Sequence, residues 1–160
     1  MVLIVLSILL AGCGGSSSES RPIETDPVPI LVSFDMVDSF EVDTATSNRA
    51  LEVASDIDNG IFDIRWRVNS LEDYQVNVSV NSVADPHKSI LVYSEVCGLG
   101  LACDQGGNLI CQYTADNNLS CGRGPIVSIS RLPLDLYLIF EVCDLDSSYC
   151  RYRYYPVYME

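Results

Sequence analysis

The sequence predicts an all-β domain that folds as an antiparallel β-sandwich, with a small closed β-barrel as the alternative. Segments rich in β-branched and aromatic residues alternate apolar with polar side chains, and turn-forming residues separate them. No segment repeats apolar residues at the 3.6-residue period of an amphipathic helix. Eight or nine short strands at this spacing are typical of a sandwich or a barrel.

The expected strands occupy most of the chain after residue 28. One or two strands are predicted in 29–42, and further strands in 51–58, 61–68, 74–80, 89–96, 108–114, 126–130, 134–142 and 149–158. The pair Asn59-Gly60 predicts a two-residue hairpin between 51–58 and 61–68, because both residues tolerate positive φ. Segment 134–142 is apolar on both faces except Asp135 and Glu141, as in a central strand, and Pro156 predicts an edge position for the last strand.

The N-terminus carries an apolar run from Val2 to Leu10, interrupted only by Ser7, that ends in Leu10-Ala11-Gly12-Cys13. The run is far shorter than the roughly 20 residues of a membrane-spanning helix and has the length of a signal peptide. The four-residue motif resembles the lipobox of bacterial lipoproteins, in which the cysteine becomes the first mature residue and carries the lipid. The resemblance implies a signal peptide in 1–12 and attachment to a membrane through a lipid on Cys13.

The lipobox resemblance also implies how the chain is divided and in which membrane it is anchored. Residues 13–27 then form the lipidated cysteine and a tether, rich first in Gly and Ser and then in Pro, and 28–160 form one domain. In the lipoprotein sorting pattern, Asp directly after the cysteine favours the inner membrane. Gly14 stands there instead, which implies the outer membrane, at its periplasmic face or at the cell surface.

Six cysteines remain when Cys13 is set aside for the lipid. They are Cys97, Cys103, Cys111, Cys121, Cys143 and Cys150. An even number in an exported chain predicts three disulfides. Cys143–Cys150 is the favoured first pair because it flanks a short polar loop between two strands. Cys111–Cys121 would clamp another turn, and Cys97–Cys103 then follows by default.

Segment 132–137, Leu-Pro-Leu-Asp-Leu-Tyr, precedes the long apolar strand and resembles a tyrosine corner. With Trp66 on an early core strand, it makes the domain similar to immunoglobulin-like and fibronectin type III-like sandwiches. This resemblance implies that the Tyr137 hydroxyl bonds back to upstream backbone.

The charge balance restricts the partners. The chain has 22 acidic and 9 basic residues, for a formal net charge of −13. Nucleic-acid binding depends on Lys and Arg, so nucleic acid is excluded as a partner. Cationic partners stay compatible with this charge.

Few residues offer catalytic chemistry. His87 is the only histidine, no nucleophile-elbow or zinc-protease motif occurs, and paired cysteines leave no thiolate. Asp56, Asp58 and Asp63 lie around the Asn59-Gly60 turn, and carboxylates at strand ends can bind Ca²⁺. This is the one cofactor hypothesis that the sequence supports, and its spacing does not match an EF-hand.

The last strand combines Tyr152 and Tyr154 with Arg151 and Arg153. Tyr and Arg are enriched at binding hot spots, so these four residues are the candidate binding surface. The leading hypothesis is a lipid-anchored, non-enzymatic binding module of the bacterial cell envelope whose partner is a protein or a glycan. The alternatives are a periplasmic inhibitor of a cationic enzyme such as a lysozyme, and a carboxylate-based hydrolase.

The anchor yields a direct prediction. Cys13→Ser removes the atom that would carry the lipid, so the protein should move from the membrane fraction to the soluble fraction after cell lysis. Unchanged fractionation of this variant, measured by immunoblot, contradicts lipidation at Cys13.

Overall fold

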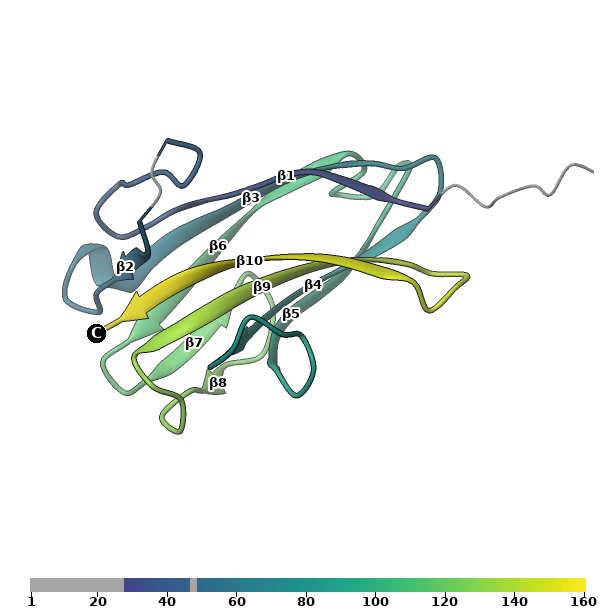
Figure 1. The fold of residues 1–160 in the computed structure, drawn as a ribbon. Helices are drawn as coiled ribbons and strands as arrows, with labels where there is room; N and C mark the ends of the chain where they lie inside the picture. Colours follow the sequence, from purple (N-terminus) through teal and green to yellow (C-terminus); the bar gives the residue numbers. More distant parts are fainter. Residues whose placement is uncertain (1–27, 47–48) are drawn as a thin grey trace, which may run out of the picture.

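The computed structural model describes residues 28–46 and 49–160 as two β-sheets packed face to face (Figure 1). The predicted sandwich is confirmed, and the barrel is wrong because the two sheets remain separate. The lipobox, Cys13 and segment 14–27 lie outside the described residues. Within the described part of the chain, no helix has the length and apolar character needed to cross a membrane.

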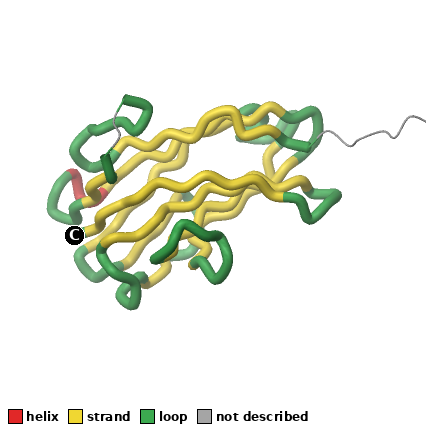
Figure 2. Tube along the Cα trace, in the orientation of Figure 1, coloured by secondary structure: helices red, strands yellow, loops and turns green. Residues whose placement is uncertain are grey.

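In the described residues ten strands build the two sheets, with their turns gathered at the two ends of the sandwich (Figure 2). They are β1 (Ile30–Val37), β2 (Leu51–Val53), β3 (Ile61–Asn69), β4 (Tyr74–Asn81), β5 (Ile90–Cys97), β6 (Gly106–Thr114), β7 (Asn118–Cys121), β8 (Val127–Ser128), β9 (Asp135–Asp144) and β10 (Cys150–Met159). The first sheet has the order β1-β3-β6-β7-β8 and the second has β2-β10-β9-β4-β5. All pairs are antiparallel except β2 with β10, which are parallel.

The core lies between the sheets and centres on Phe140 of β9. Its ring stacks on Phe34 of β1 at 5.1 Å and lies 5.2 Å from Trp66 of β3, so aromatic side chains from both sheets meet there. On the other face of β9, Ile139 is also fully buried. Since β9 pairs with both β4 and β10, the predicted central strand is confirmed.

The predicted hairpin around Asn59-Gly60 is wrong, although both residues have the positive φ that the prediction used. Segment 51–53 does not pair with β3 but joins the second sheet beside residues 157–159 of β10. The intervening turn includes a short 3-10 helix, η1 (Asp58–Gly60), and leads the chain from one sheet to the other. The physical reason is that β3 already pairs with the long strands β1 and β6 on its two sides, so it has no free edge for segment 51–53. Leu51 and Val53 are instead fully buried against the second sheet.

The tyrosine corner is not observed. Tyr137 lies within β9, and its ring packs edge-on against Tyr154 of β10 with 5.6 Å between centroids. No hydrogen bond of the Tyr137 hydroxyl occurs among the described residues. Trp66 does lie in the core, as the sequence predicts.

All three predicted disulfides are present: Cys97–Cys103, Cys111–Cys121 and Cys143–Cys150. Two of them join directly opposed residues of adjacent strands, Cys111 of β6 with Cys121 of β7 and Cys143 of β9 with Cys150 of β10. Both of these pairs have a Cα–Cα distance of 4.0 Å, typical of the close, non-hydrogen-bonded positions of an antiparallel ladder. These bridges therefore fix the register of two strand pairs.

Gly60 supports a stability prediction. Its φ is +67°, and a Cβ there would overlap the Tyr113 carbonyl oxygen. Gly60→Ala should therefore lower the free energy of unfolding by about 2–4 kcal/mol, measured by urea denaturation. Gly100→Ala is the matched control, since Gly100 has φ +83° with nothing within 4 Å, and it should cost only about 1–2 kcal/mol. Equal losses in the two variants contradict the close packing at Gly60.

Candidate binding surface

Tyr152 and Tyr154 lie on the outer face of the second sheet, where alternation along β10 directs both rings away from the core. Their side chains are 46% and 49% exposed. Tyr152 lies opposite Glu141 of β9, and Tyr154 lies opposite Ile139. Ile139 is buried beneath this face of the sheet, and the Tyr137 ring packs edge-on against the Tyr154 ring. The orientation of the Tyr154 ring is therefore fixed by its neighbour.

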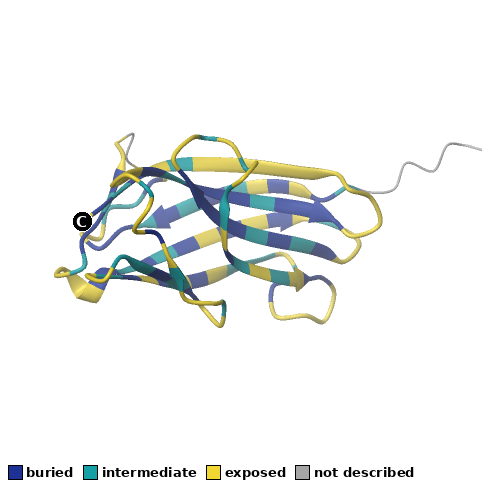
Figure 3. Ribbon diagram, turned by 90° about the horizontal axis from the view of Figure 1, so that it is seen from below, coloured by how far each residue is buried: buried dark blue, intermediate teal, exposed yellow. Residues whose placement is uncertain are grey.

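Arg151 and Arg153 alternate with the two tyrosines and lie on the opposite side of β10. Both are exposed. Figure 3 shows that the strand at this edge of the sheet is exposed over most of its length. Arg151 lies over the Tyr149 ring at 5.8 Å, a cation–π contact. No carboxylate among the described residues forms an ion pair with either arginine.

An opening of about 360 Å³ lies beside these arginines, lined by Leu31 of β1 and residues 149–153. The four residues of the candidate surface thus share one exposed half of β10 but lie on its two faces, with the tyrosines outside and the arginines beside the opening. We call Arg151, Tyr152, Arg153 and Tyr154 the β10 surface.

Glu141 is the carboxylate next to this surface, and the sequence alone did not single it out as a site residue. Partial burial on the sheet face raises the pKa of Glu141, and nearby His87 opposes this shift. His87 reaches this position because the loop after β4 folds back, with the Asn81 amide donating to the carbonyls of Asp85 and His87 at 2.7 and 3.2 Å. The exposed His87 ring in turn contacts the Asp85 carboxylate at 2.8 Å.

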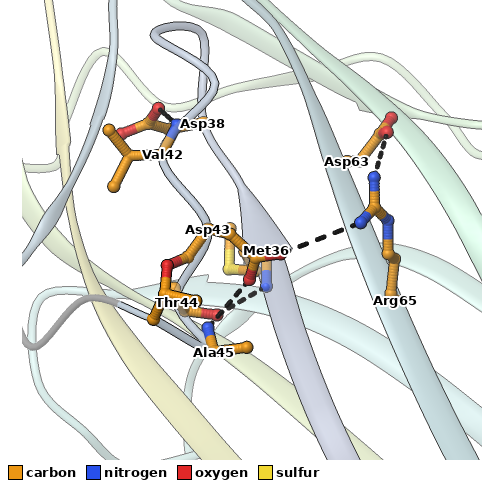
Figure 4. A network of polar contacts seen from close by, with 9 residues as sticks. Met36, Asp38, Val42, Asp43, Thr44, Ala45, Asp63 and Arg65 are labelled. Atoms are coloured by element: carbon orange, nitrogen blue, oxygen red, sulfur yellow. Dashed lines mark hydrogen bonds and ion pairs between the residues drawn. The ribbon is translucent and has the colours of Figure 1, made fainter.

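The three carboxylates proposed for Ca²⁺ are not brought together. Asp56, Asp58 and Asp63 do not form a group of potential ligands within 4.8 Å of one another. The Asp63 carboxylate instead contacts the Arg65 guanidinium at 3.5 Å, and Arg65 also lies 3.9 Å from Asp43 (Figure 4). The hairpin on which the Ca²⁺ hypothesis depended is absent, so the structure gives no support to this site.

The one group of three potential metal ligands in the described residues is Glu95, Cys97 and Cys103. The two cysteines are disulfide-bonded to each other. Their sulfur atoms are therefore not thiolates, and only the Glu95 carboxylate remains as a ligand.

A further groove, of about 760 Å³, lies at the opposite edge of the second sheet, between β5 and the segment after β7. Tyr93, Leu109 and Ile110 line it together with Glu95 and Arg123. The Tyr93 hydroxyl donates to the Glu95 carboxylate, and burial together with this bond raises the pKa of Tyr93. The Glu95 charge is thus engaged within the chain. The sequence did not indicate this groove, because its walls come from separate strands.

Comparisons of the chain with protein-family models, with curated protein sequences and with solved structures find no match.

Glu141 gives a pH prediction. Its raised pKa means that the folded state holds a proton that the unfolded state releases near the ordinary value of 4.5. The contribution of Glu141 to stability is therefore present at low pH and is lost as pH rises through the folded-state pKa. Glu141→Gln stays neutral, so the variant should gain stability relative to the wild type between about pH 4 and pH 7 in urea denaturation. If the free energies of unfolding of Glu141→Gln and of the wild type differ by the same amount at about pH 4 and at about pH 7, the raised pKa of Glu141 is contradicted.

Proposed function

We propose that this chain is a lipid-anchored, non-enzymatic binding module of the bacterial cell envelope that holds its partner at the β10 surface. The observation that carries the proposal is the pair of exposed tyrosines, Tyr152 and Tyr154, which alternate with two arginines that have no carboxylate partner among the described residues. The Tyr154 ring is also held by the edge-on contact with Tyr137. Tyr and Arg are the residues that most often dominate binding energy at interfaces.

Rigidity of the surface favours binding. β10 pairs with β9 over its whole exposed half, and the Cys143–Cys150 disulfide closes the end of that pair. A surface held in place before binding loses little conformational entropy on association.

The place of the surface in the domain agrees with an anchored module. Leu31, at the start of β1, lines the same opening as residues 149–153, so the described chain begins beside the β10 surface. Only residues 14–27 separate Cys13 from the described chain. A lipid on Cys13 would then keep the β10 surface near the membrane, within reach of other envelope molecules.

Two features support the non-enzymatic assignment. The six cysteines of the domain are all disulfide-bonded. His87, the only histidine of the chain, lies in an exposed turn and contacts Asp85.

Glu141 favours one second candidate, the carboxylate-based hydrolase. A carboxyl group with a raised pKa is suited to act as a general acid. Incubation of the wild type and of Glu141→Gln with a panel of envelope glycans tests this. Turnover by the wild type that Glu141→Gln abolishes supports the hydrolase, and absence of turnover by the wild type contradicts it.

The double variant Tyr152→Ala/Tyr154→Ala tests the binding module. Loss of two hot-spot rings should weaken retention of envelope proteins or glycans by the immobilised protein by about tenfold or more. Ile126→Ala is the control, because Ile126 is 74% exposed and lies between β7 and β8 in the other sheet. Retention that is unchanged in the double variant contradicts the assignment of the partner site to the β10 surface.

A further inference from the structure

We propose that the free edge of β10, from Cys150 to Pro156, accepts an extended acidic segment of a partner protein as an added antiparallel strand. This inference rests on the proposed function and names the partner class and its mode of binding. In the second sheet β2 pairs only with residues 157–159, so among the described residues 150–156 has a neighbouring strand on the β9 side alone.

The direction of the backbone groups along this edge follows from one hydrogen bond. The Asp144 amide donates to the Tyr149 carbonyl at 3.0 Å, so this opposed pair is a hydrogen-bonded one. Hydrogen-bonded and non-bonded pairs alternate along an antiparallel ladder. Arg151 and Arg153 therefore direct their amide and carbonyl groups to β9, and Tyr152 and Tyr154 direct theirs to the free edge.

Two independent observations agree with this alternation. The next pair along the ladder, Cys143 and Cys150, has the short Cα–Cα distance of 4.0 Å expected of a non-hydrogen-bonded pair. Pro156 belongs to the same set as Tyr152 and Tyr154, and proline, which has no N–H, fits where that group would point away from the ladder. The edge therefore offers the N–H groups of Tyr152 and Tyr154 to an incoming backbone.

The side chains beside this edge indicate which segment fits. An added strand presents alternate side chains beside Arg151 and Arg153, and the remaining ones beside Tyr152 and Tyr154. The two arginines are exposed cations with no ion pair among the described residues, in a chain whose net charge is −13. A segment that alternates acidic with apolar residues is complementary to both faces of β10.

A second copy of this chain fits the edge poorly. Antiparallel pairing of two β10 edges centred on Tyr152 places Arg151 of one copy opposite Arg153 of the other. Like charges in directly opposed positions are destabilising. Nucleic acids and glycans, in turn, lack the row of backbone amides that an unpaired strand edge recognises.

The test uses the full chain in detergent and a labelled synthetic peptide of about ten residues that alternates Glu with Val. Fluorescence anisotropy should detect binding that weakens as salt concentration rises. Absence of binding at any salt concentration overturns the proposal.

Substitutions at Tyr154 separate backbone from ring recognition. Tyr154→Pro removes an amide that faces the free edge without removing one from the ladder with β9, and it should weaken peptide binding about tenfold or more. Tyr154→Val keeps the amide and the strand preference and loses only the ring, so it should weaken binding clearly less than Tyr154→Pro does. If Val weakens binding as much as Pro, the ring is what is recognised; strand addition is then wrong, while the proposed function stands.

Peptide variants test the same point on the unchanged protein. In an antiparallel pair, peptide residues opposite the tyrosines direct their N–H groups to β10, and those opposite the arginines direct theirs away. N-methylation of the Val amides should therefore abolish binding, and N-methylation of the Glu amides should leave the affinity of the peptide unchanged. Equal effects of the two methylation patterns overturn strand addition.

Charge reversal tests the acidic preference. The variant Arg151→Glu/Arg153→Glu should lose the Glu–Val peptide and bind a Lys–Val peptide instead. A variant that still prefers the Glu–Val peptide contradicts the role of the arginines. Self-association of the wild type in sedimentation, lost on Tyr154→Pro, would identify a second copy as the occupant and overturn the acidic partner.

Discussion

The register between β9 and β10 is the constraint on which the rest of the structure depends. β9 is buried on both faces, with Phe140 in the core and Ile139 beneath the outer surface, so it accepts β10 in one alignment. A slip of one residue would turn every β10 side chain to the other face of the sheet. The tyrosines would then point inward and the arginines outward. The Cys143–Cys150 bridge fixes this alignment where the two strands meet.

The same strand shows how an exposed edge is kept from unwanted pairing. Natural sheets protect such edges with short covering strands, prolines and charged side chains. All three devices occur on β10: β2 covers residues 157–159, Pro156 follows, and Arg151 and Arg153 carry charge near the open end. These devices act against pairing with a second copy. Because the charge is of one sign, they leave the edge open to a segment of opposite charge.

Features that depend on neighbouring residues could be predicted from the sequence. The alternation within β4, the apolar character of both faces of β9 and the three disulfides all rest on short sequence separations, and the structure contains them. The edge position predicted for the last strand holds only in part, because β2 pairs with residues 157–159 and leaves the half of β10 that includes Pro156 uncovered. Residues 118–121, which form β7, were not predicted as a strand, since two of the four are Asn118 and Ser120. Polar strands of this length give no alternation that can be recognised.

Features that depend on distant segments could not be predicted. The local signal at Asn59-Gly60 correctly indicated positive φ, but the partner of segment 51–53 is the end of the chain, about 100 residues away. The Ca²⁺ hypothesis depended on that hairpin and lost its basis with it. Likewise, His87 approaches Glu141 only because the loop after β4 folds back toward the sheet. The charge on Arg151 and Arg153 was visible in the sequence, but their position at an unpaired edge was not.

Amide hydrogen exchange along β10, followed by NMR on the full chain, tests this account most directly. With β10 paired on one side only, the amides of Arg151, Arg153 and Tyr155 should be protected by β9, while those of Tyr152 and Tyr154 should exchange rapidly. Uniform protection of all five amides would mean that another strand already covers the edge. Protection of Tyr152 and Tyr154 alone would mean that the register differs by one residue.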